Sequence, residues 1–143
     1  MIRKKVNELI KKHKTNDPYL LADILNIHVV SRYLNHEING FYKLEQRNKF
    51  IVINKDLCYE MQRYVCAHEL GHSILHPKSN IHFLRKNTFY SVNKIETEAH
   101  KFAVELLIPD NQLKEYMRLS MYEIACIFGV PKELIKLKKF NFF

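Results

Sequence analysis

A chain of 143 residues has room for one compact domain. Hydrophobic residues make up 47% and charged residues 27%, which excludes a disordered, collagen-like or disulfide-scaffold protein. The 23 Lys and Arg against 15 Asp and Glu give a net charge of +8, a moderate surplus that bears on which partners are attracted but specifies no chemistry.

The cysteines and the apolar pattern indicate the compartment. Cys58, Cys66 and Cys126 are an odd number without a Cys-x-x-Cys pair, so we expect no disulfide framework. The chain contains no run of 18 apolar residues, so we expect no transmembrane helix. The first fourteen residues carry charges throughout, unlike a secretory signal. We therefore expect a cytoplasmic protein with no membrane partner.

The first part of the chain combines an interrupted helix with the start of a sheet. Apolar residues recur at three- and four-residue spacing through about Ile27, with an interruption near residues 16–18. The strand-like segments are residues 28–34, 41–46 and 49–54. Asn39-Gly40, between the first two, is a turn signal. The apolar run in the last of the three segments suits a buried central strand and also a strand that pairs with an extended substrate, and the residues leave both open.

The rest of the chain has mainly helical patterns. We expect helices at about residues 56–77, 94–107, 111–119, 121–128 and 131–139. Residues 77–93 are the least regular and are expected to form a loop near a site, and Gly129 marks the break before the last helix. The predicted fold class is therefore α+β, a single domain over residues 1–143 in which a small early sheet packs against helices.

The longest predicted helix carries the motif His-Glu-x-x-His at residues 68–72. His68 and His72 are four residues apart, so on a helix they share one face and can bind one metal ion. Glu69 follows the first histidine, where its carboxylate can accept a proton from a water molecule at the open side of that ion. Neutral imidazole is a good zinc ligand, and a catalytic zinc ion takes three protein ligands. The motif therefore predicts a zinc site that needs one more ligand.

The predicted helix at residues 94–107 offers two carboxylates for the third position. The metzincin alternative would need a histidine at position 78, where this chain has Lys78. Glu96 shares its helical face with apolar residues that must be buried, whereas Glu98 shares its face with charged residues, Glu105 among them, that are expected to face water. A buried carboxylate is costly unless a cation receives it, so Glu96 is the predicted ligand and Glu98 a solvated residue.

Other side chains near the motif leave alternatives open. His100 lies one turn beyond Glu96, and it either orients a ligand, donates a hydrogen bond to the transition state, or is an ordinary histidine. We expect His76 to end its helix rather than to bind metal, and Cys66 to pack as a small apolar residue. The candidates for an oxyanion donor are Tyr90, His100 and Tyr116.

Two segments match the pattern of a known family. His68-Glu-Leu-Gly-His-Ser-Ile-Leu-His76 is similar to HExGHxxLH, and Glu96-Thr-Glu-Ala-His-Lys-Phe-Ala-Val-Glu-Leu-Leu-Ile-Pro109 is similar to ExEANxFAxxLLMP. Over most of its length the chain thus resembles the ImmA/IrrE-type metallopeptidases of mobile elements and bacterial stress responses. It departs from their pattern at His100, where the family usually has Asn, and at Ile108, where it often has Met.

The resemblance implies a gluzincin-like zinc endopeptidase, with His68, His72 and Glu96 as ligands of Zn²⁺ and Glu69 as the base. It further implies that the substrate is a helix-turn-helix repressor of a phage-like or conjugative element, whose cleavage derepresses genes. The alternative function is a regulator that binds a repressor or DNA through the same domain without cutting it.

Residues 111–143 have a weak helix-turn-helix pattern of their own. Ala125, Gly129 and Ile135 have the spacing of that motif. The predicted second helix has a basic edge made of Lys132, Lys136, Lys138 and Lys139. No Arg, Asn or Gln that could reach base edges lies on residues 131–139, so we do not expect direct DNA binding.

Overall fold

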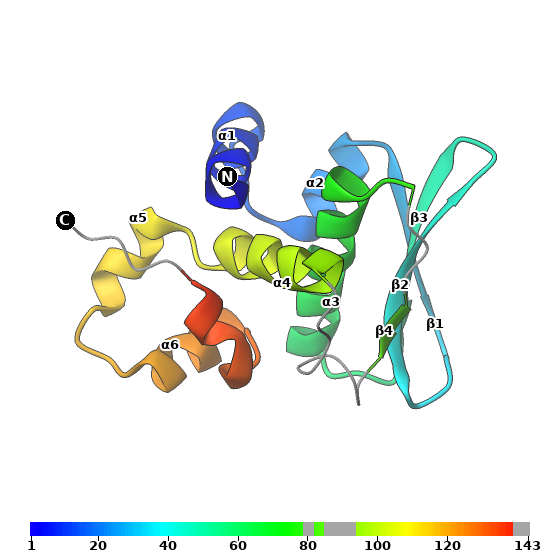
Figure 1. Cartoon of the computed structure of the whole chain (residues 1–143). Coiled ribbons are helices and arrows are strands. Elements are labelled where there is room, and N and C mark those ends of the chain that lie inside the picture. Colours follow the sequence, from blue (N-terminus) through cyan, green and yellow to red (C-terminus); the bar gives the residue numbers. More distant parts are fainter. Residues whose placement is uncertain (79–81, 85–93, 139–143) are drawn as a thin grey trace.

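The computed structural model describes residues 1–78, 82–84 and 94–138, and it confirms the α+β fold class. Its elements in chain order are α1 (Ile2–His13), α2 (Pro18–Ile24), β1 (Ile27–Arg32), β2 (Ile38–Glu45), β3 (Asn48–Asn54), α3 (Tyr59–Leu75), β4 (His82–Leu84), α4 (Lys94–Leu107), α5 (Asp110–Leu113), the 3₁₀ helix η1 (Lys114–Tyr116), α6 (Met121–Phe128) and the 3₁₀ helix η2 (Lys132–Leu137). The helices lie on one face of the sheet, and α4 crosses α3 (Figure 1). Within the described residues, no helix has the length and apolar character that a membrane span requires.

The sheet has the strand order β1-β3-β2-β4, in which β1 is parallel to β3 and β2 is antiparallel to both β3 and β4. β3 is therefore an inner strand, and its residues 51–54 are buried. A strand that is hydrogen-bonded on both sides cannot add an extended substrate, so of the two interpretations of this apolar run the buried central strand is correct. β4 lies within the segment predicted to be a loop, of which residues 79–81 and 85–93 are outside the described residues.

Two glycines allow close packing on both sides of α3. A Cβ atom on Gly40 of β2 would lie 2.6 Å from the carbonyl oxygen of Val52 and 2.6 Å from Cγ1 of Val65, so glycine lets α3 approach the sheet. A Cβ atom on Gly71 would lie 3.0 Å from the ring of Phe102 in α4. The helix that carries the His-Glu-x-x-His motif is thus held tightly between the sheet and α4.

Several local predictions need correction. Asn39-Gly40 is not a turn but part of β2, beside a register shift against β4, because the glycine serves close packing instead. The interruption near residues 16–18 does separate α1 from α2, where the side chain of Asp17 caps α2. The last predicted helix is the six-residue 3₁₀ helix η2, and Gly129 adopts the left-handed conformation (φ 69°) at the predicted break.

A buried ionic cluster fastens the C-terminal part to α4. Lys138 Nζ donates hydrogen bonds to Glu105 Oε1 at 2.7 Å and to Asp110 Oδ1 at 2.8 Å, and Arg3 of α1 also pairs with Asp110. Burial alone would raise the pKa of Asp110, but its bonds with Lys138 and Arg3 hold this pKa below its usual value. Two expectations are therefore wrong: Glu105 does not face water, and Lys138 is not part of a basic edge.

Candidate metal centre

α3 carries the side chains of the His-Glu-x-x-His motif into the interior. His68 and Glu69 are fully buried, and His72 is 1% exposed. The ring centroids of His68 and His72 lie 4.8 Å apart, with ring planes at 85°. The four-residue spacing therefore places both rings on one side of the helix, as predicted.

Glu96 of α4 contacts both histidines. Its Oε1 lies 2.6 Å from His72 Nε2, and its Oε2 lies 3.3 Å from His68 Nε2. Burial by itself would raise the pKa of Glu96, but hydrogen bonds with His68 and His72 hold this pKa well below its usual range. Burial lowers the pKa of His68, while the neighbouring Glu96 opposes that shift. The carboxylate that the helical face singled out is thus the one that meets the two imidazoles.

Glu69 is the second carboxylate of this cluster. Its Oε2 lies 3.9 Å from His68 Nε2. Burial raises the pKa of Glu69 well above its usual value, the negative charge of Glu96 raises it further, and the nearby backbone of Tyr42 opposes the rise. Two carboxylates buried together repel each other unless a proton or a cation neutralises one of them. The cluster is therefore suited to a cation.

His100 adds a further side chain from the next turn of α4. Its ring centroid lies 4.2 Å from that of His68, and its Nδ1 lies 2.8 Å from the Tyr64 hydroxyl. Because Tyr64 occupies Nδ1, His100 can offer only Nε2 to the cluster. Single ligand atoms of His68, Glu96 and His100 lie within 4.8 Å of one another, close enough to share an ion.

The donor set fits a divalent metal of the zinc type. Imidazole nitrogens and carboxylate oxygens are the ligands of catalytic zinc sites, which use three protein ligands. Either His72 or His100 can complete a trio with His68 and Glu96. The Nε2 atoms of His68 and His72 each face a different oxygen of the same carboxylate, and this favours the trio predicted from the sequence.

The comparison with known proteins decides the family. Residues 22–138 match the IrrE N-terminal-like domain, Peptidase M78. The chain belongs to this family. It is 49% identical over 140 residues to "Uncharacterized immunity region protein 2" of Bacillus phage phi105, covering 96% of this chain and 89% of the phage protein. It is 35% identical over 141 residues to Metallopeptidase ImmA of Bacillus subtilis (strain 168), covering 91% of this chain and 79% of ImmA. The resemblance to ImmA/IrrE-type metallopeptidases is thereby confirmed.

Three residues of this M78 domain belong to the site's surroundings although the sequence pattern gave them other roles. The hydroxyl of Tyr64, which has the spacing of a core residue, binds His100. His76 does follow the last residue of α3, as predicted, but its Nδ1 also lies 3.1 Å from His72 Nδ1. Glu98 is not simply solvated, because its Oε1 lies 3.1 Å from His76 Nε2 and its side chain is only 32% exposed. The four-residue spacing between His72 and His76 was the feature of the sequence that could have predicted the contact between their rings.

The remaining predicted residues have simple placements. Cys66 is fully buried among apolar side chains, as expected, and burial raises the pKa of its thiol. Of the three candidates for an oxyanion donor, His100 lies in the cluster, and Tyr116 packs edge-on against Phe128 with ring centroids 5.4 Å apart. The third, Tyr90, is outside the described residues.

Proposed function

We propose that this chain is a zinc-dependent endopeptidase that cleaves a helix-turn-helix repressor of a phage-like or conjugative mobile element. The observation that carries the proposal is the convergence of Glu96 on the Nε2 atoms of His68 and His72, with Glu69 buried beside them. Membership of the M78 family supports peptide-bond hydrolysis, and the similarity to an immunity-region protein of a phage supports a repressor as the substrate.

His68, His72 and Glu96 hold the metal ion in this proposal. A bound zinc ion supplies Lewis acidity, which polarises the scissile carbonyl and activates water at neutral pH. Glu69, 3.9 Å from His68 Nε2, accepts the proton of the attacking water and returns it to the leaving amine. Its burial keeps competing water away from that proton transfer.

Tyr64 and His100 have a supporting role. When the Tyr64 hydroxyl donates to Nδ1 of His100, the ring carries its proton on Nε2, the nitrogen on the side of the cluster. A histidine in this tautomer is a hydrogen-bond donor and not a metal ligand. We therefore assign His100 to the oxyanion of the transition state and His72 to the metal.

The decisive test of function compares Glu69→Gln with Glu60→Gln, an exposed glutamate on the same helix. Each variant is co-expressed with the helix-turn-helix repressor of its own element, and the repressor is followed by intact-protein mass spectrometry. We expect the wild type and Glu60→Gln to cleave it, and Glu69→Gln to keep its zinc and its melting temperature but lose cleavage by at least about 100-fold. Undiminished cleavage by Glu69→Gln would reject the mechanism. If the wild type and both variants bind the repressor but do not cleave it, the result would instead favour a non-proteolytic regulator.

The ligand assignment has its own test. Elemental analysis of the purified protein should find one zinc ion per chain in the wild type and in His100→Ala, and none in His72→Ala or Glu96→Ala. Zinc retained by His72→Ala but lost from His100→Ala would exchange the roles of these two histidines.

A further inference from the structure

A chain of hydrogen bonds leads away from the metal centre on the far side of His72. Its Nε2 faces Glu96, while its Nδ1 lies 3.1 Å from Nδ1 of His76, and Nε2 of His76 lies 3.1 Å from Oε1 of Glu98. The two glutamates flank the pair of rings and come from the same helix, α4, whereas the two histidines come from the end of α3.

The chemistry of the groups sets the direction of these bonds when a metal ion is bound by His72 and Glu96. The carboxylate of Glu98 is an acceptor, so the proton in its contact lies on Nε2 of His76. A neutral His76 then has a lone pair on Nδ1, and the proton between the two rings must lie on Nδ1 of His72. Nε2 of His72 lies 2.6 Å from Glu96 Oε1, so a proton lies between these two atoms as well unless a metal ion bound by both residues takes its place. With that ion, Nε2 of His72 would carry the lone pair. This is the tautomer that a metal ligand bound through Nε2 requires.

We propose that His76 and Glu98 are positioning residues, which hold His72 in the tautomer and orientation that present Nε2 to the metal. This inference rests on the metal centre of the proposed function but not on peptide cleavage. Outer partners of this kind orient a ligand histidine and increase its basicity, and their loss typically weakens metal binding by about 10- to 100-fold.

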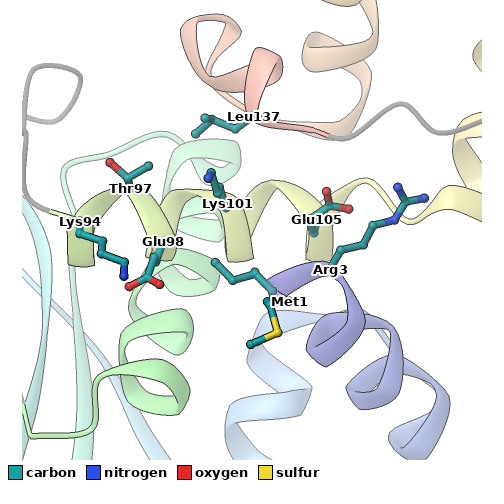
Figure 2. Close-up of a pocket in the computed structure, with 9 residues that line it drawn as sticks. Met1, Arg3, Lys94, Thr97, Glu98, Lys101, Glu105 and Leu137 are labelled. Atoms are coloured by element: carbon teal, nitrogen blue, oxygen red, sulfur yellow. The ribbon is translucent and has the colours of Figure 1, made fainter.

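The end of α3 fixes His76 beside His72, and Glu98 completes the hydrogen-bond chain nearer the surface. The backbone N–H of His76 donates to the carbonyl of His72 at 2.7 Å, so the helix end fixes the second ring next to the first. The side chain of His76 is 10% exposed, and that of Glu98 is 32% exposed. Glu98 lines a cavity of about 440 Å³ together with Met1, Thr97 and Lys101, and Figure 2 shows it on the lower edge of α4 there. The hydrogen-bond chain thus runs from the buried metal centre to the surface.

The test measures zinc affinity by competition with a chromogenic chelator. We expect His76→Ala and Glu98→Ala each to weaken zinc binding by about 10- to 100-fold. The double variant should bind as His76→Ala does, because Glu98 acts through His76. Glu98→Gln keeps an acceptor oxygen and should recover most of the affinity. The matched control is Glu8→Ala, an exposed helical glutamate of α1, which should bind as the wild type does.

A second measurement reads the tautomers directly. In the zinc-loaded protein, nitrogen-15 NMR should find the proton of His72 on Nδ1 and that of His76 on Nε2. Melting curves of the metal-free proteins should superimpose for the wild type and Glu98→Ala, which separates positioning from folding.

The outcomes distinguish this inference from the proposed function. Zinc affinity within twofold of the wild type in both single variants overturns the positioning role while leaving the metal centre intact. A proton found on Nδ1 of His76 also overturns the positioning role. A loss of zinc by His76→Ala as complete as that by Glu96→Ala does so too, because His76 would then be a metal ligand. A wild-type chain that binds no zinc overturns the positioning role and the metal centre together.

Discussion

Replacing Gly40 by alanine should destabilise the protein and weaken its metal site together. The new Cβ atom would lie 2.6 Å from the carbonyl oxygen of Val52 and 2.6 Å from Cγ1 of Val65. The first obstacle belongs to the neighbouring strand β3, and the second to the buried face of α3. Neither atom is the end of a long side chain, so relief requires α3 to move away from the sheet.

The distances set the size of the effect. Both contacts are about 0.8 Å shorter than the 3.4 Å at which ordinary contact begins. Overpacking of a core costs about 1–3 kcal/mol, and two rigid neighbours place Gly40→Ala at the upper end. The gain of about 0.5–1 kcal/mol from replacing glycine in a strand offsets part of it. A net loss of about 2–2.5 kcal/mol corresponds to about 6–10 °C in melting temperature for a chain of this size.

Thermal melts of the metal-free protein and zinc titrations measure the two consequences. Because Val65 lies one turn before His68, displacement of α3 should also weaken zinc binding. Gly71→Ala is the internal comparison: its Cβ would meet Phe102 at 3.0 Å, and the gain in helix propensity of about 1 kcal/mol should leave its stability within about 1 kcal/mol of the wild type. Adding Val65→Ala to Gly40→Ala removes one obstacle, so the double variant should lose less than the sum of the single losses. A melting temperature for Gly40→Ala within 2 °C of the wild type would refute this reasoning.

Three smaller predictions address the surroundings of the site. Tyr64→Phe should cost about 1–3 kcal/mol, because the buried His100 loses a hydrogen bond, yet keep its zinc; loss of zinc on elemental analysis would mean that the pair holds the metal. Cys66 should resist timed alkylation at neutral pH while Cys58, which is exposed, reacts, because burial raises the pKa of the Cys66 thiol; mass spectrometry that finds Cys66 labelled first would contradict this. Lys138→Met should lower the stability by about 3 kcal/mol in urea unfolding, since two charge-assisted hydrogen bonds are lost, and an unchanged midpoint would show that the cluster contributes little.

The spacing of residues in the sequence was enough to predict the structure where a single physical requirement acts on a segment. The four-residue spacing of His68 and His72 predicts that they share one helical face, and the structure confirms this. Residues 64–73 of α3 are, however, buried on every side and not along one stripe. Asn39-Gly40 shows the limit, because a glycine for a turn and a glycine for close packing look alike in a sequence. Only the approach of Val65 from α3, distant along the chain, decides between them.

The same limit explains the mixed result for α4. The prediction assumed one buried and one wet face, but α4 packs against α3 and also against α1 and η2. The supposedly wet side therefore carries carboxylates with protein partners: Glu105 meets Lys138, and Glu98 meets His76.

Burial alone cannot tell a metal ligand from an ion-pair partner, because the cost of desolvating a carboxylate is the same in both cases. What separates Glu96 from Glu105 is the charge of the partner. Glu105 pairs with the positively charged Lys138, whereas Glu96 meets two imidazoles, His68 and His72, with a second buried carboxylate, Glu69, close to one of them. Neutral imidazoles leave that pair of carboxylates uncompensated, and a divalent cation bound by both rings removes the deficit.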